Sequence, residues 1–290
     1  MLTGETLRLP DGDVGYLRRA GAEGRGTLVL AHANGLNAGA YRPVLAALSP
    51  GRTVVALDAR GHGRTTLPAE PETMTRWDRY GEDIARILRA LDPDGPLTLA
   101  GHSLGAVSAL LAIAQGLDAE RLIMVEPVVL PRTMRVVART PLRRALMRRG
   151  IAGRAARRRN GWPDAGAVRD AYAGKGFFKA WDAAALDGYL ARGLTEVPDG
   201  VRLSCDPAWE AATFAAQGHG FWRHLGAATE RMPVHVLKAR GRSTVPDADV
   251  MRLVRAGALV TEAEGGHMLP AERPAHVAAY IDMTMAGAGV

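Results

Sequence analysis

The sequence predicts an α/β fold with a mostly parallel sheet, helices on both faces and an inserted helical cap. Short apolar runs alternate with helix-like stretches up to Pro127 and again after Arg231, as in the crossover units of a parallel sheet. Residues 128–231 lack this alternation and are rich in Arg, Ala, Gly and Trp. A chain of 290 residues with 47% hydrophobic content can bury one large core and carry such an insertion.

The elements follow one another in a regular order. In the first half we expect strands at Thr27–Leu30, Thr53–Leu57, Leu97–Ala100 and Leu122–Val125, and helices at Tyr41–Leu48 and Arg76–Leu91. After the insertion we expect a strand at Val234–Lys238, a helix at Asp247–Arg255, a strand at Ala258–Thr261 and a closing helix from Ala271. We therefore assign residues 1–127 and 232–290 to the α/β core and residues 128–231 to the cap.

Composition narrows the class of protein. No apolar run approaches the roughly 18 residues that a membrane-spanning helix needs, and the N-terminus lacks the basic-then-apolar layout of a secretion signal. We therefore expect a cytoplasmic protein without an integral membrane segment. A single cysteine, Cys205, supports neither a disulfide framework nor a thiolate metal site. We expect no cofactor and no metal ion.

The positive charge is concentrated in one segment. The chain has a formal net charge of +7, and residues 132–159 hold eleven arginines and no acidic residue. The rest of the chain is therefore net negative, which favours a solvated basic face over a nucleic-acid partner. An acidic partner or a membrane surface is the alternative. No aromatic residues are interleaved with these arginines, which argues further against single-strand binding.

A candidate nucleophile lies between an expected strand and an expected helix. Gly101-His102-Ser103-Leu104-Gly105 follows the strand Leu97–Ala100 and precedes a helix-like stretch, which is the context of a nucleophile elbow. The glycines fit a strained turn in which side chains would collide with the neighbouring strand and helix. The same turn directs the Leu104 N–H and the helix N-terminus toward a developing oxyanion.

A serine hydroxyl needs a base, and His267 is the candidate. It lies in a glycine-containing loop after the last expected strand, Glu264-Gly265-Gly266-His267, and late in the chain as the order serine, acid, histidine requires. The other seven histidines have simpler accounts in packing or on the surface.

Four stretches resemble the α/β-hydrolase superfamily: Ala31–Gly35, Leu57–Gly63, the Ser103 elbow and Gly266-His267. The likeness extends over nearly the whole chain outside the cap. In that superfamily a His-Gly-x-Pro loop after the third strand supplies the second oxyanion donor. Its counterpart here is His32-Ala33-Asn34-Gly35, so the resemblance implies that Asn34 donates its backbone N–H and that His32 shapes the loop.

The position of the acid that orients the histidine departs from the commonest pattern of that superfamily. That pattern resembles Gly-x-x-Asp and follows the first strand after the cap. Here that place reads Arg240-Gly241-Arg242-Ser243-Thr244, without a carboxylate. The nearest acids, Asp247 and Asp249, follow Pro246 at the start of an expected helix, where acids favour the helix dipole.

Glu126 is the better candidate for the acid. It directly follows the strand Leu122–Val125, at the sheet edge where active groups of open parallel sheets gather. Burying a lone glutamate there is costly and favours a functional role. Haloalkane dehalogenases look similar at this position. Asp247, Asp249 or a dyad without an acid are the alternatives.

The predicted function is that of a serine hydrolase. Ser103, His267 and Glu126 would cleave a carboxylic ester or thioester of a small acyl substrate through an acyl-enzyme. The chain resembles a capped esterase- or lipase-like subgroup with its acid after the sixth strand. Trp181 and Trp222 are candidates for pocket walls. A carbon–carbon bond hydrolase or lyase on the same triad is one alternative, and a non-catalytic ligand-binding protein is another. The sequence does not predict an oligomeric state.

Overall fold

The core is an eight-stranded sheet in the order β1-β2-β4-β3-β5-β6-β9-β10. The computed structural model describes residues 1–131 and 150–287, so most of the arginine-rich stretch lies outside the described residues. Strand β2 pairs antiparallel with both β1 and β4, and all other neighbours are parallel. The strands are β1 (Thr3–Leu9), β2 (Gly12–Arg19), β3 (Thr27–Ala31), β4 (Thr53–Leu57), β5 (Leu97–His102), β6 (Arg121–Val125), β9 (Val234–Ala239) and β10 (Leu259–Ala263). The predicted fold class is confirmed.

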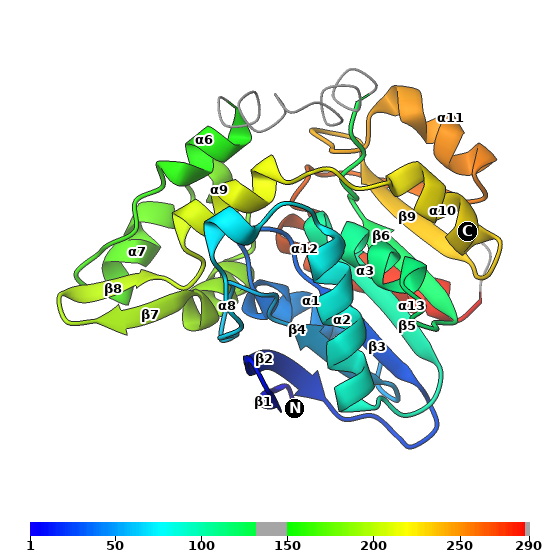
Figure 1. Cartoon of the computed structure of the whole chain (residues 1–290), viewed down its shortest axis with the longest axis horizontal. Helices are drawn as coiled ribbons and strands as arrows, with labels where there is room; N and C mark the ends of the chain where they lie inside the picture. The colour runs from blue at the N-terminus through cyan, green and yellow to red at the C-terminus, as the bar shows by residue number, and fades with distance from the viewer. Residues whose placement is uncertain (132–149, 288–290) are drawn as a thin grey trace.

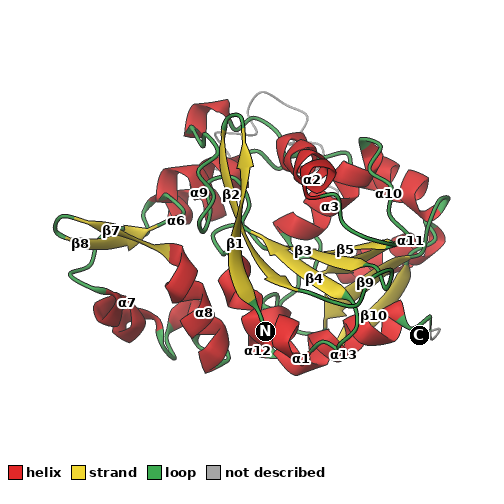
Figure 2. Cartoon of the chain, turned by 90° about the horizontal axis from the view of Figure 1, so that it is seen from below, coloured by secondary structure: helices red, strands yellow, loops and turns green. Residues whose placement is uncertain are grey.

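Helices cover both faces of this sheet (Figure 2). On one face lie α2 (Asp78–Leu91), α3 (Leu104–Ala114), α10 (Phe221–Thr229) and α11 (Asp247–Arg255), and on the other lie α1 (Arg42–Ala47) and α13 (Pro274–Met285). Alternate residues of a strand enter the two cores: in β6, Leu122 and Met124 face one layer, while Ile123 and Val125 face the other. This two-sided burial explains why the parallel strands are continuously apolar.

The insertion forms a lobe beside the sheet (Figure 1). Its described elements are α6 (Ile151–Ala156), α7 (Ala165–Tyr172), the 3-10 turn η3 (Gly176–Phe178), α8 (Ala183–Gly193), β7 (Leu194–Val197), β8 (Gly200–Leu203) and α9 (Pro207–Ala215). The sequence led us to expect helices alone, but β7 and β8 form an antiparallel hairpin. Helix α10, inside the range assigned to the cap, packs on α3 and so adds to the core layer.

Several further elements differ from the sequence-based expectation. The β1–β2 hairpin was not predicted, because β1 is an edge strand with few buried residues and little apolar patterning. The closing helix is divided into α12 (Leu269–Glu272) and α13, which starts at Pro274; a proline cannot continue the preceding helix. Two more 3-10 turns, η1 (Ala38–Tyr41) and η2 (Pro71–Thr73), connect the core elements. Within residues 1–131 and 150–287, no helix is both long and apolar enough to cross a membrane.

Candidate active site

Ser103 lies at the sharp turn between β5 and α3. Its backbone has a φ of +56°, a conformation that is strained for any residue with a side chain. The turn is also tightly packed: a Cβ on Gly101 would lie 2.4 Å from the Ala106 nitrogen, and one on Gly105 would lie 2.1 Å from the Ala31 carbonyl oxygen. The glycines are therefore required on both sides of the serine, as the elbow pattern predicts.

Ser103, His267 and Glu126 form one hydrogen-bonded chain. The Ser103 Oγ lies 3.0 Å from His267 Nε2, and His267 Nδ1 lies 3.0 Å from Glu126 Oε2. Ser103 is 7% exposed and Glu126 is fully buried, whereas the His267 side chain is 23% exposed. The structure thus brings together the three side chains that the sequence selected, from three separate loops at one edge of the sheet.

Glu126 occupies a position similar to that of Ser103. It directly follows β6, has a φ of +48° and extends the sheet ladder by donating its N–H to the Leu237 carbonyl at 2.8 Å. Its carboxylate accepts hydrogen bonds from the Ala239 N–H at 2.6 Å, the Ser243 hydroxyl at 2.7 Å and the Thr244 N–H at 3.0 Å. These donors can hold a buried negative charge without a lysine or arginine.

Ser243 and Thr244 are site residues that the sequence analysis did not assign. They stand where the commonest pattern of the superfamily has its acid, and here they orient an acid from another strand. The Thr244 Oγ1 also lies 3.2 Å from His267 Nδ1 and 3.0 Å from the Glu126 carbonyl oxygen. The absence of an aspartate in Arg240–Thr244 could have indicated their role. When the acid comes from another strand, its carboxylate still needs hydrogen-bond donors, and Ser243 and Thr244 supply them.

The alternative acids lie on α11. Asp247 is at its first position, has a side chain that is 92% exposed and forms an ion pair with Lys238 at 2.8 Å. Asp249 is buried on the same helix. The carboxylate within hydrogen-bond distance of the His267 imidazole is that of Glu126.

Two backbone amides near the serine are available as donors. In the loop after β3, the Ala33 N–H donates to the Tyr41 hydroxyl at 2.9 Å, the Gly35 N–H to His62 Nε2 at 3.0 Å and the Leu36 N–H to the Ala33 carbonyl. Within the described chain, neither the Asn34 N–H nor the Leu104 N–H has an acceptor. These are the two amides that were expected to form the oxyanion hole.

Two buried histidines shape this loop. His32 donates from Nδ1 to the Ala33 carbonyl at 2.8 Å and accepts the Ala59 N–H at Nε2. His62 donates from Nδ1 to the Arg60 carbonyl and accepts the Gly35 N–H. Burial lowers the pKa of His32, and burial together with the nearby His32 lowers the pKa of His62 to about 3. Both rings are therefore neutral near pH 7 and can accept these amides.

A third buried histidine links the two loops of the site. His102 Nδ1 accepts a hydrogen bond from the Tyr41 hydroxyl at 2.7 Å, and its Nε2–H donates to the His267 carbonyl at 2.7 Å. Burial and the adjacent His267 place the pKa of His102 well below its usual range. Because Tyr41 also accepts from Ala33, one continuous relay connects the candidate oxyanion loop to the His267 loop.

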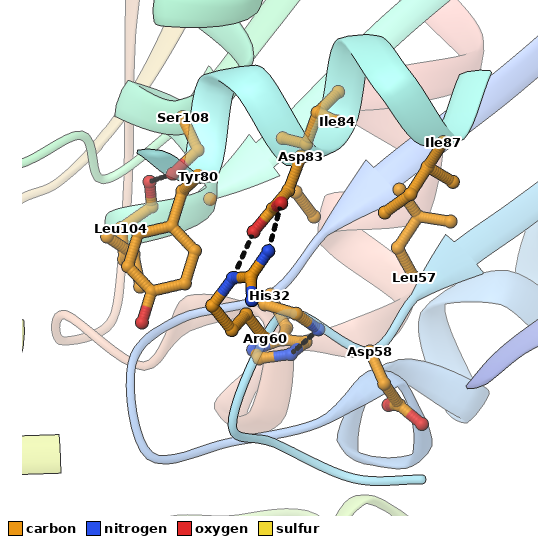
Figure 3. Close-up of a pocket in the computed structure, with 13 residues that line it drawn as sticks. His32, Leu57, Asp58, Arg60, Tyr80, Asp83, Ile84, Ile87, Leu104 and Ser108 are labelled. Carbon is orange, nitrogen blue, oxygen red and sulfur yellow. Dashed lines mark hydrogen bonds and ion pairs between the residues drawn. The ribbon is translucent and has the colours of Figure 1, made fainter. Parts of the chain in front are cut away.

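A small cavity lies beside the elbow, next to a buried ion pair (Figure 3). Arg60 and Asp83 face each other there through two hydrogen bonds of 2.8 and 2.6 Å, and His32, Leu104 and Ser108 complete much of the wall. Its volume of about 20 Å³ suits a single water molecule. It is too small to be the substrate pocket.

A much larger pocket of about 1000 Å³ opens onto His267. Its wall combines the core residues Asn34, Ser243, Thr244 and Met268 with cap residues. The aromatic lining comes from Tyr172, Phe177, Phe178, Tyr189 and Phe214. Neither Trp181 nor Trp222 lines it, contrary to expectation: Trp181 packs among Phe177, Phe178 and Tyr189, and the Trp222 ring lies under Arg252. Among the described residues, no group of three His, Cys, Asp or Glu side chains is arranged to hold a metal ion.

Comparisons with known proteins bear on the family and the fold of the chain. A sequence model of the alpha/beta hydrolase family matches residues 28–279. The curated 2-(acetamidomethylene)succinate hydrolase of Mesorhizobium japonicum is 38% identical over 100 residues, which make up 34% of this chain and 34% of that protein. The aligned stretch therefore spans about a third of the length of that relative.

Solved structures resemble the whole chain. The crystal structure of an E-2-(acetamidomethylene)succinate hydrolase superposes with a TM-score of 0.78 and 22% identity, covering 99% of this chain and 100% of the other. A thioesterase domain from the curacin biosynthetic pathway superposes with a TM-score of 0.74 and 20% identity, covering 97% and 99%. At these identities the likeness establishes the fold.

Proposed function

Because the chain belongs to the alpha/beta hydrolase family, we propose that it is a serine hydrolase that cleaves a carboxylic ester or thioester through an acyl-enzyme on Ser103. The observation that carries the proposal is the unbroken chain of hydrogen bonds from the Ser103 hydroxyl through His267 to Glu126. Its order and spacing are those of a nucleophile, a base and an orienting acid.

In the first stage, the Ser103 Oγ attacks the carbonyl carbon of the substrate. His267 Nε2 takes the hydroxyl proton, while its Nδ1–H donates to Glu126, which fixes the tautomer and stabilises the imidazolium. The carbonyl oxygen becomes an oxyanion, which accepts hydrogen bonds from the backbone N–H groups of Asn34 and Leu104. As the tetrahedral intermediate collapses, His267 gives the proton to the leaving alcohol or thiol.

In the second stage, water hydrolyses the acyl-enzyme. His267, again neutral, takes a proton from water, and the resulting hydroxide attacks the acyl carbon. The same two amides stabilise the second oxyanion. The proton then returns to the Ser103 oxygen and the carboxylic acid leaves. His32 and His62 act as positioning residues in both stages, because they hold the loop that carries Asn34.

A fluorophosphonate probe tests the nucleophile. We expect labelling of the wild-type protein and loss of labelling in Ser103→Ala, with peptide mapping that places the adduct on the Gly101–Gly105 peptide. The control is Ser108→Ala, which removes another hydroxyl near the elbow, one that donates to the Leu104 carbonyl. Absence of labelling in the folded wild type, or equal labelling of Ser103→Ala, would contradict the proposal.

An ester panel tests the reaction. With 4-nitrophenyl esters of increasing acyl length, we expect a burst of 4-nitrophenolate equal to the enzyme concentration wherever deacylation is slower than acylation. The burst should vanish in Ser103→Ala. Acyl-length preference then measures how much of the large pocket the acyl chain occupies.

Hydrolysis of a different bond on the same triad is the second candidate. It is favoured by the relative from Mesorhizobium japonicum, whose name gives a substituted succinate as its substrate. A triad does not encode the leaving group, so a carbon–carbon bond hydrolase or lyase would use the same residues. The discriminating result is fluorophosphonate labelling without turnover of any ester in the panel or of thioesters of the same acyl groups.

A further inference from the structure

Basic side chains converge on the large pocket from separate segments. Arg154, Arg158 and Arg159 come from α6 and the residues that follow it, Lys179 comes from the turn after η3, and Arg242 comes from the core loop beside Ser243. Except for Arg158, each of these side chains belongs to an exposed residue. Cations from both the cap and the core therefore surround one cavity.

The two acids that line the same pocket are already engaged. Glu210 is buried and forms an ion pair with Arg158. The Glu272 Oε2 accepts the Gly266 N–H at 2.6 Å. For Arg154, Lys179 and Arg242, no carboxylate partner lies within ion-pair distance among residues 1–131 and 150–287. The pocket wall thus holds five cations and two carboxylates, an excess of positive charge.

This excess of positive charge is electrostatically unfavourable in the free protein and becomes favourable when an anion binds in the pocket. Like charges around one hollow repel each other, and low-dielectric walls focus their field into it. The wall here supplies such a medium, because aromatic rings line much of the cavity. In an ordinary solvated basic surface the charges are spread over the outside of the molecule. Here they line one pocket that also contains His267.

The Arg158 guanidinium brings this positive charge close to the reaction centre. Its Nη2 donates to the Tyr189 hydroxyl at 3.2 Å, and its Nη1 binds Glu210. Glu210 in turn contacts the oxyanion loop: its carbonyl accepts the Asn34 side-chain amide at 3.0 Å, and a Cβ on Gly35 would lie 2.5 Å from its Oε1. Asn34, Glu210 and Arg158 therefore lie next to one another in the wall of the same pocket, so a substrate carbonyl bound at Asn34 would share this pocket with the cations.

We propose that the substrate carries an anionic group, such as a carboxylate, on the part of the molecule that lies beneath the cap, and that Arg154, Lys179 and Arg242 bind it. This inference rests on the proposed function, since it specifies the substrate class of the same site. Guanidinium and ammonium groups at the pocket wall suit a carboxylate, which they bind by charge-assisted hydrogen bonds.

Three esters of equal chain length test the inference. They are mono-4-nitrophenyl adipate, 4-nitrophenyl hexanoate and the 4-nitrophenyl ester of 6-trimethylammoniohexanoate, which are anionic, neutral and cationic at the far end. At low salt we expect kcat/KM to be about tenfold higher for the adipate ester than for the hexanoate ester, and lowest for the cationic ester. Raising the ionic strength to about 0.2 M should reduce these ratios.

Charge-removing variants locate the effect. Arg154→Gln/Lys179→Gln, and separately Arg242→Gln, should lower the adipate-to-hexanoate ratio at least about threefold. Arg8→Gln/Arg89→Gln removes two exposed positive charges that do not line the pocket and should leave the ratio unchanged. A wild-type ratio of one or less would overturn the inference, as would a ratio that responds equally to both double variants.

A measurement of ligand binding tests the inference even if no ester is cleaved. In that case the proposed function fails, and calorimetry on the Ser103→Ala protein decides the inference separately. We expect monomethyl adipate to bind more tightly than methyl hexanoate, with an affinity that falls as salt is added and in Arg154→Gln/Lys179→Gln. Equal affinity for the two esters would overturn the inference.

Discussion

At the scale of single residues, the two residues that follow β5 and β6 have the same unusual backbone. Ser103 and Glu126 both have a positive φ directly after a parallel strand, which turns each side chain out of the sheet at its carboxyl edge. His267 comes from the loop after β10 and lies between them. The strain at each turn is offset by ladder hydrogen bonds: the Ser103 N–H donates to Val125 and the Glu126 N–H donates to Leu237.

Replacement of Glu126 tests which carboxylate serves His267. In Glu126→Gln the amide cannot stabilise an imidazolium, so we expect kcat for 4-nitrophenyl esters to fall by about 10³–10⁴. Asp247→Asn is the matched control and should retain wild-type kcat, because its carboxylate binds Lys238. A Glu126→Gln protein with kcat within about tenfold of wild type would assign the acid elsewhere.

Tyr41 provides a test of the hydrogen-bonded relay between the loop after β3 and the His267 loop. Tyr41→Phe leaves the buried Ala33 N–H and His102 Nδ1 without partners, which should lower the free energy of unfolding by about 1–3 kcal/mol. It should also reduce kcat about tenfold, because both loops lose a fixed position. Tyr80→Phe removes another buried hydroxyl, bonded to Thr213, and should affect stability alone. Equal kcat in the two variants would exclude a positioning role for Tyr41.

At the scale of elements, helix α8 joins the cap to the core through one buried ion pair. Arg192, on α8, binds Asp58 with Nη2 at 2.6 Å, and the two side chains are 12% and 0% exposed. Asp58 also accepts the Ala38 and Arg64 N–H groups. Asp58 therefore has an architectural role, because it fixes the turn after β4 and binds the cap helix.

Breaking this ion pair should greatly reduce the free energy of unfolding. Arg192→Gln leaves a buried carboxylate without its cation, so we expect a loss of about 3 kcal/mol in the free energy of unfolding by urea. The control is Arg169→Gln, which breaks the pair between Arg169 and Asp187, whose side chains are 46% and 51% exposed. That variant should lose less than about 1 kcal/mol. Similar losses in the two variants would contradict the attachment role of Arg192.

Local patterns and long-range contacts differ in how well the sequence predicts them. The strands β3 to β6 and the elbow follow from apolar runs and from glycine spacing, which are local signals. The cap hairpin and the β1–β2 pair do not, because β7 and β8 have only four residues each and β1 has no buried residue, so these strands are fixed by pairing rather than by periodicity. Ser243 and Thr244 were missed for a related reason: they acquire a role only because folding brings Glu126 to them from another strand.

At the scale of the whole molecule, buried neutral histidines link stability to pH. His32, His62 and His102 each have a lowered pKa in the folded protein, whereas the unfolded chain titrates near 6.5. The unfolded state therefore binds more protons as pH falls below about 6.5. Stability is fully present above that pH and is lost as the pH decreases toward the folded pKa values.

His219 allows this linkage to be measured away from the site. It stacks on Trp77 at 5.1 Å, neither of its ring nitrogens has a partner within the described chain, and burial lowers its pKa to about 4. His219→Phe keeps a ring on Trp77 and removes the group that the unfolded state protonates. Relative to wild type, we expect it to gain up to about 2 kcal/mol in the free energy of unfolding between pH 7.5 and pH 5. Urea titrations followed by tryptophan fluorescence at the two pH values measure the gain, with the pH 7.5 pair as the internal control. An identical loss of stability in variant and wild type on acidification would show that His219 is not held neutral in the fold.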